Sequence, residues 1–146
     1  MILYLDTSSL IKLYVEESGS AETEHLVGEA TLVCTSVVAY AEARSALARL
    51  CRDGDLTPDE HETAKADLNR DWPRYLAIEV ASDVRQSAGD LAERRALRGF
   101  DSLHLASYLD LYSASLGEPT RFSSFDDRLM GAERAETEQT PLREDE

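Results

Sequence analysis

The feature that most constrains the fold is a regular alternation of short apolar runs with longer helical segments. Four runs have the length and residue types of strands in a sheet, at 2–5, 32–34, 76–80 and 120–123. The stretches between them carry helix signals; at 57–60, for example, a threonine can cap a helix and Glu60 can complete a capping box. Strands separated by helices pair in parallel, so the sequence predicts an α/β fold with helices on both faces of a mostly parallel sheet.

The length of 146 residues fits one domain. We expect this domain to span 1–132, with its last short helix running from Ser124 to about Ala132. Residues 133–146 are polar, acidic and poor in large apolar side chains, so we expect them to form a flexible tail.

The charge balance is strongly acidic, with 29 Asp plus Glu against 15 Lys plus Arg and a formal net charge of −14. Such a balance argues against binding nucleic acid through a broad basic face, which needs many phosphate contacts. A polyanionic substrate would require a local reversal of the field, which a bound cation supplies. No apolar run approaches the roughly 20 residues of a membrane-spanning helix, and Cys34 and Cys51 fit neither a disulfide framework nor a zinc site. We therefore expect a cytoplasmic protein with no membrane association.

Two aspartates stand where the functional site of a parallel sheet is expected, beyond the carboxyl ends of the strands. Asp6 directly follows the first run, and a helix-capping role is its alternative interpretation. Asp126 and Asp127 follow the fourth run. The segment 124–127 resembles a capping box with Asp127 in the reciprocal position, which would leave Asp126 free for the site.

Two further acids lack an ordinary structural explanation. Glu42 lies within a predicted helix among small side chains and has no cation at helical spacing, although a simple exposed glutamate is the alternative. Asp101 begins the most apolar helix, where it can complement the helix dipole, but a buried carboxylate without a partner is costly. The four acids together form a set of oxygen ligands suited to Mg²⁺ or Mn²⁺.

Four segments in order make the chain resemble the PIN-domain family, and within it the VapC toxins of toxin–antitoxin pairs. These segments are YLDTSSLIKLY at 4–14, TS with AEARSAL at 35–47, GFDSLHLA at 99–106 and FSSFDDRL at 122–129.

The resemblance implies a three-layer α/β/α fold with a five-stranded sheet, although only four strands are evident from the residues. A fifth, at the edge, would have to come from 137–140. It also implies a divalent-metal endoribonuclease that hydrolyses RNA, dimerises and binds an antitoxin protein. By position, Asp6, Glu42, Asp101 and Asp126 match the acidic quartet of the family. Ser8 matches the hydroxyl residue that supports the first aspartate.

Other residues allow two interpretations each. His104 could ligate metal or move a proton, but we favour a hydrogen-bonded core or supporting group. Arg94, Arg95 and Arg98 could guide phosphate, or could equally form a solvated helix face.

Three other classes of protein compete with the nuclease interpretation. A phosphatase with an aspartyl nucleophile would need a second acid where Ser8 stands, and a phosphoacceptor domain would need a lysine that neither Lys12 nor Lys65 can supply. A non-catalytic α/β interaction module remains the alternative. It would keep the fold, tolerate loss of the four acids and show no metal dependence.

Overall fold

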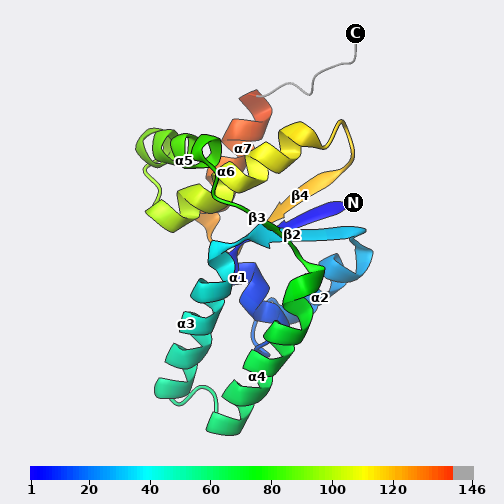
Figure 1. The fold of residues 1–146 in the computed structure, drawn as a ribbon, viewed down its shortest axis with the longest axis vertical. Helices are drawn as coiled ribbons and strands as arrows, with labels where there is room; N and C mark the ends of the chain where they lie inside the picture. The colour runs from blue at the N-terminus through cyan, green and yellow to red at the C-terminus, as the bar shows by residue number, and fades with distance from the viewer. Residues whose placement is uncertain (140–146) are drawn as a thin grey trace.

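The computed structural model describes residues 1–139, and a four-stranded parallel sheet lies at its centre (Figure 1). The strands are β1 (Ile2–Leu5), β2 (Leu32–Ser36), β3 (Leu76–Ile78) and β4 (Thr120–Ser123). Their order across the sheet is β3-β2-β1-β4, and all three pairings are parallel. The predicted α/β class and the four strands are thus confirmed.

The helices connect these strands and cover both faces of the sheet. In chain order they are α1 (Thr7–Leu10), the 3-10 turn η1 (Ile11–Leu13), α2 (Ser20–Glu29), α3 (Val38–Arg52), α4 (Pro58–Asp71), the 3-10 turn η2 (Trp72–Arg74), α5 (Ser82–Arg95), α6 (Gly99–Ala114) and α7 (Asp127–Gln139). Figure 1 shows α5, α6 and α7 on one side of the sheet and α1 to α4 on the other. The fold therefore has three α/β/α layers.

The central strand β1 explains why two separate cores form. Successive side chains of a strand point to opposite faces of its sheet. Ile2 and Tyr4 pack into the core under α5, α6 and α7, whereas Leu3 and Leu5 pack into the core under α1, α3 and α4. All four residues are buried, so β1 is held from both sides.

The direction of the chain changes at β1, and this change positions the site. The chain runs from β1 outward to β2 and β3, then crosses back to place β4 on the other side of β1. In open parallel sheets, such a switch in strand order opens a crevice at the carboxyl ends of the two strands. Asp6 follows β1 and Asp126 lies three residues after β4, so both stand at this crevice.

Two expected boundaries are wrong. The last helix does not begin at Ser124 and end near Ala132, because α7 runs from Asp127 to Gln139. Part of the expected tail is therefore helical, and Glu136 within it is buried. The expected edge strand at 137–140 does not form over 137–139, which belong to α7; Thr140 and the rest of the expected tail lie outside the described residues. Within 1–139, no helix is long and apolar enough to cross a membrane.

Candidate active site

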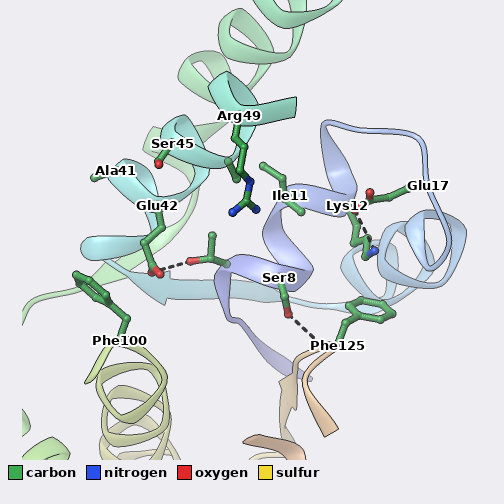
Figure 2. Close-up of a pocket in the computed structure, with 12 residues that line it drawn as sticks. Ser8, Ile11, Lys12, Glu17, Ala41, Glu42, Ser45, Arg49, Phe100 and Phe125 are labelled. Carbon is green, nitrogen blue, oxygen red and sulfur yellow. Dashed lines mark hydrogen bonds and ion pairs between the residues drawn. The ribbon is translucent and has the colours of Figure 1, made fainter. Parts of the chain in front are cut away.

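A pocket of about 660 Å³ opens at the carboxyl end of β1, between α1, α3 and the starts of the last two helices (Figure 2). Its lining includes Thr7, Ser8, Glu42, Arg49, Phe100 and Phe125. Ser8 and Glu42 are two of the five residues that the sequence predicts for the site. The other three, all aspartates, lie next to residues of this lining: Asp6 precedes Thr7, Asp101 follows Phe100 and Asp126 follows Phe125.

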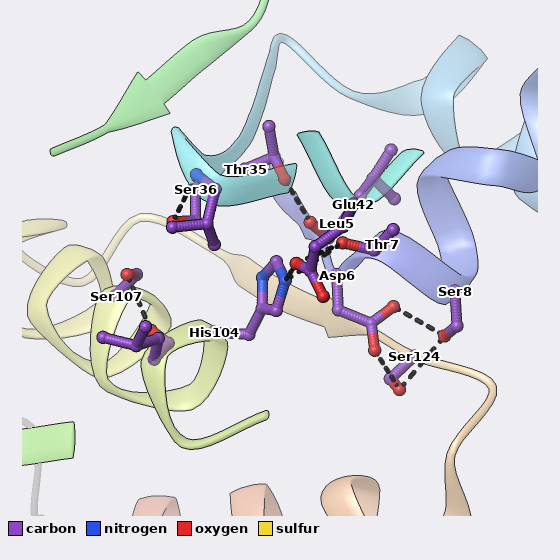
Figure 3. Close-up of polar contacts among 12 residues, drawn as sticks. Leu5, Asp6, Thr7, Ser8, Thr35, Ser36, Glu42, His104, Ser107 and Ser124 are labelled. Atoms are coloured by element: carbon purple, nitrogen blue, oxygen red, sulfur yellow. Dashed lines mark hydrogen bonds and ion pairs between the residues drawn. The ribbon is translucent and has the colours of Figure 1, made fainter. Parts of the chain in front are cut away.

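Asp6 is buried, with 4% of its surface exposed, and polar groups hold both of its carboxylate oxygens (Figure 3). Oδ1 accepts the Ser8 hydroxyl at 2.7 Å and the Ser9 backbone N–H at 3.0 Å. Oδ2 accepts the Ser124 hydroxyl at 2.5 Å. Asp6 is therefore also the N-cap of α1, and the expected support from Ser8 is present as a direct hydrogen bond.

Asp126 has a different local role from the one expected. The sequence assigned helix capping to Asp127, but Oδ1 of Asp126 accepts the backbone N–H groups of Arg128 at 2.9 Å and Leu129 at 3.1 Å. Asp126 therefore caps α7, because the helix starts at Asp127 rather than at Ser124. Both bonds use Oδ1, so Oδ2 is the oxygen of Asp126 left to face a cation.

Asp101 lies in the first turn of α6 and is half-buried. Burial raises its pKa above the ordinary value for an aspartate, and the neighbouring charges of Asp126 and Asp6 raise it further. His104 and Arg98 act in the opposite direction. Asp6 and Asp126 are thus close enough for their charges to act on Asp101, although the three aspartates come from three separate segments of the chain.

Glu42 is held by a chain of hydrogen bonds that runs into the core (Figure 3). Its Oε1 accepts the Thr7 hydroxyl at 2.8 Å and lies 2.8 Å from Nε2 of His104. The other ring nitrogen of His104, Nδ1, lies 2.8 Å from the buried hydroxyl of Tyr4. A neutral imidazole with its proton on Nε2 satisfies both bonds: it accepts from Tyr4 and donates to Glu42. Although burial acts to raise the pKa of Glu42, the bonds from His104 and Thr7 bring it below its ordinary value.

His104 itself is 2% exposed, and both of its ring nitrogens are hydrogen-bonded within the protein. The interpretation of His104 as a supporting core group is therefore confirmed. A ligating role would require it to give up its bond to Glu42 or to Tyr4.

The negative charges of Asp6 and Asp126 thus act on Asp101. Glu42 belongs to a separate hydrogen-bond network beside them. Within 1–139, no three His, Cys, Asp or Glu side chains lie close enough to form a ready-made metal site. The donor set nevertheless fits a hard cation, since it consists of carboxylates whose mutual repulsion a positive charge would relieve. Mg²⁺ usually keeps several of its waters, so carboxylates can hold it across a wider gap than direct ligation allows.

Two residues of this network were not identified from the sequence. Thr7 joins Glu42 to the end of β1, and Ser124 bonds to Asp6 across 118 positions of sequence. Ser124 was visible only as part of a possible capping box, and the partners of both residues became known only from the strand order.

The three arginines before α6, Arg94, Arg95 and Arg98, have different roles. Arg94 and Arg95 form ion pairs with Glu136 of α7 at 3.0 and 2.8 Å, so these two arginines serve helix packing. Arg98 is the member whose charge acts on Asp101.

Comparison with known proteins agrees with this geometry. A family model described as PIN domain matches residues 3–129, a range that begins within β1 and extends into α7. The chain belongs to the PIN domain family. The match contains all five predicted site residues.

Two curated relatives narrow the comparison within that family. They are Ribonuclease VapC45 and Ribonuclease VapC49, from two strains of Mycobacterium tuberculosis. Each is 38% identical to this chain over 122 residues, covering 81% of the chain and 78% of the relative.

Proposed function

We propose that the protein is a divalent-metal-dependent endoribonuclease of the VapC type, the toxin of a toxin–antitoxin pair. The family match and the two VapC relatives support an activity on RNA. The observation that supports the metal dependence is the position of Asp101, whose pKa is raised first by burial and then by the negative charges of Asp126 and Asp6. Asp6 and Asp126 also cap helices, but these capping roles do not explain why Asp101 lies within reach of their charges.

Asp6, Asp101 and Asp126 would hold Mg²⁺ or Mn²⁺, directly or through water. Once bound, the cation neutralises phosphate oxygens and makes a bound water easier to deprotonate. Ser8 and Ser124 orient Asp6, because each donates a hydroxyl hydrogen bond to one of its two oxygens. Asp126 is fixed by its capping bonds through Oδ1. The chain thereby presents ligand oxygens whose positions are set before substrate binds.

Glu42 is the residue suited to accept a proton from the attacking water. Thr7 and His104 both bond to Oε1, so Oε2 is the oxygen left to face water or substrate. The lowered pKa of Glu42 keeps it ionised, so its free oxygen can accept a proton, but the same shift makes it a weaker base than an ordinary glutamate. The products of this step are a hydrolysed phosphodiester and a protonated carboxyl group, which returns its proton to solvent.

The wider assignment concerns partners. A VapC-type protein is expected to bind a cognate antitoxin protein and to form a homodimer, and we place the protein in the cytoplasm where its RNA substrate is found. The non-catalytic interaction module is the less favoured alternative, because it gives no reason for the negative charges of Asp6 and Asp126 to lie near Asp101.

Cleavage of defined RNAs in the presence of Mg²⁺ or Mn²⁺ tests this function. The wild-type protein should cut, and EDTA should abolish cutting. Asp6→Asn should lower the rate at least about a hundredfold if Asp6 holds the cation. Metal-dependent cleavage that is unchanged in Asp6→Asn and in Asp101→Asn would refute the site assignment.

A further inference from the structure

The pocket beside the acidic centre has a second half that the proposed chemistry does not use. Its walls carry two exposed phenylalanines: Phe100 is 55% exposed and Phe125 is 41% exposed. In Figure 2 the two rings lie on opposite sides of the pocket, and Arg49 points into it from α3. We call this half, defined by Arg49, Phe100 and Phe125, the aromatic groove.

Each phenylalanine directly precedes a predicted ligand aspartate. Phe100 is followed by Asp101 and Phe125 by Asp126, on segments that are 25 positions apart in the chain. A group stacked on either ring therefore lies against the residue next in sequence to one of the predicted ligand aspartates. Phe125 is fixed in place, because its backbone N–H donates to the Ser8 hydroxyl at 2.9 Å and the Lys12 ammonium lies 4.8 Å from its ring centre. Phe100 has no ring partner among the aromatic pairs of the described residues, so its face is open.

Arg49 supplies a positive charge to the groove and forms no ion pair with any acid of residues 1–139. The two acids that line the pocket are already bonded: Glu17 to Lys12 at 2.9 Å, and Glu42 to Thr7 and His104. Arg49 is exposed. It stands seven residues after Glu42 on α3, which places it two turns further along the same helix face, roughly 10 Å away. An uncompensated arginine in a chain of net charge −14 marks this groove as a local anion site.

We propose that the aromatic groove binds an unpaired stretch of the RNA substrate, with a nucleobase stacked on Phe100 and a phosphate of the same strand at Arg49. This proposal rests on the proposed nuclease function and assigns Phe100 and Arg49 to the binding of the RNA strand beside the acidic centre. An open aromatic face recognises bases that are out of a duplex, because paired bases cannot turn onto it. The whole pocket, of which the groove is one part, has a volume of about 660 Å³, which lies within the range of ligand sites.

The test is the binding of a fluorescein-labelled, unstructured eight-nucleotide RNA, followed by fluorescence anisotropy in EDTA so that no cleavage occurs. Phe100→Leu keeps an apolar side chain but removes the ring, and should weaken binding roughly 5- to 100-fold. Phe100→Trp should restore or tighten binding. Its tryptophan fluorescence should fall on RNA addition beyond any change that wild type shows through Trp72. A hairpin whose bases are all paired should bind weakly to every variant.

Arg49→Ala should reduce the slope of log affinity against log salt by about 0.7, the value for one single-strand phosphate contact. Arg52→Ala is the matched control, because it removes the same charge from the same helix outside the pocket. It should leave the slope unchanged. Melting temperatures of all variants should stay near wild type, since the substituted side chains are exposed.

Unchanged RNA affinity in Phe100→Leu, or equal salt slopes for Arg49→Ala and Arg52→Ala, would overturn the proposal. A Phe100→Leu protein that binds RNA as wild type does but no longer binds a protein partner would assign the groove to protein docking. That result would also overturn the proposal. Phe100-dependent binding without any metal-dependent cleavage would uphold the groove and refute the nuclease, so the two failures are distinguishable.

Discussion

Hydroxyl groups fix the orientation of the carboxylates at the centre of the molecule. Ser8 and Ser124 each bond to one oxygen of Asp6, and Thr7 bonds to Glu42. A serine or threonine hydroxyl can donate one such bond without adding charge. The carboxylates therefore keep their negative charge for a cation while their geometry is held in place.

Thr7→Val tests this role of hydroxyl groups. The substitution keeps the side-chain shape but removes the donor to Glu42, so it should lower the free energy of unfolding by about 1 kcal/mol. RNA cleavage should also slow, because Glu42 is then held by His104 alone. Thr7→Ser, which restores the hydroxyl, should recover both properties. Urea unfolding and cleavage rates measure the two effects, and a Thr7→Val protein equal to wild type in both would contradict the role.

At the scale of single residues, the sequence predicted which acids matter better than what each one does. Asp6 and Asp126 were recognisable because they follow apolar runs, and these positions at the switch in strand order are now observed. Helix capping by Asp6 was an open alternative and is observed. The capping role of Asp126 was misjudged, because the start of α7 is set by three residues of irregular chain that leave no periodic pattern. Whether the four acids bind metal stays a prediction.

The length of α7 illustrates how a tertiary contact extends an element. The sequence after Ala132 has few apolar side chains, which favoured a flexible tail. In the structure, Glu136 forms ion pairs with Arg94 and Arg95 of α5, and its side chain is only 11% exposed. Such a contact between segments about 40 positions apart leaves no mark in local periodicity, so the helix end could not be predicted.

Acid titration tests the docking of α7. The bonds from Arg94 lower the pKa of Glu136 below its ordinary value, and those from Arg95 add to this effect. A lowered folded-state pKa means that the contribution to stability is present above the unfolded pKa, roughly 4.3, and is lost as pH falls through the folded value. Glu136→Gln should therefore cost about 1–2 kcal/mol at pH 7 and much less near pH 3.

The exposed Glu138 on the same helix provides the control for that titration. Glu138→Gln should change stability by less than about 0.5 kcal/mol at either pH. Urea unfolding at pH 7 and pH 3 gives the comparison. A cost of Glu136→Gln that does not shrink in acid would show that the ion pairs do not hold the helix.

The turn before α2 connects the packing of an element to the aromatic groove. Gly19 has φ +93°, and a Cβ built on it would lie 2.5 Å from Cε1 of Phe125. The position therefore needs glycine for its backbone conformation and also for the space that Phe125 occupies.

Gly19→Ala should consequently lower the free energy of unfolding by about 2–3 kcal/mol. Gly54→Ala separates the two causes, because Gly54 has φ +81° but nothing within 4 Å of its Cβ position. Gly54→Ala should cost only the strain of a positive φ at a residue with a Cβ, about 1–2 kcal/mol. Thermal unfolding compares the two variants, and equal losses would mean that Phe125 moves aside freely and is not fixed in the groove.

At the scale of the whole molecule, the fold was largely predictable. Alternating strands and helices specify a parallel sheet with two covered faces, and the structure confirms this class and all four strands. The PIN-domain resemblance is confirmed by the family match over 3–129. The fifth strand was implied by resemblance alone, and no apolar run in the sequence supports it.

The charge of the whole molecule makes the central claim testable without a known RNA. A chain of net charge −14 that gathers three aspartates at one crevice stores repulsion there, and a bound cation should stabilise the fold. At a Mg²⁺ concentration 100 times its Kd, the gain is about 2.7 kcal/mol, which corresponds to a rise in Tm of roughly 5–10 °C.

The most direct test is therefore a thermal melting titration with Mg²⁺ and with Mn²⁺, on wild type, Asp101→Asn and Asp110→Asn. Asp110 lies on the same helix as Asp101 but is exposed, so its variant is the matched control. Wild type and Asp110→Asn should gain several degrees with metal. Asp101→Asn should melt no lower than wild type in EDTA, because it relieves repulsion, and should lose most of the gain. A wild type indifferent to both metals, or an Asp101→Asn protein that responds as wild type does, would contradict the metal centre.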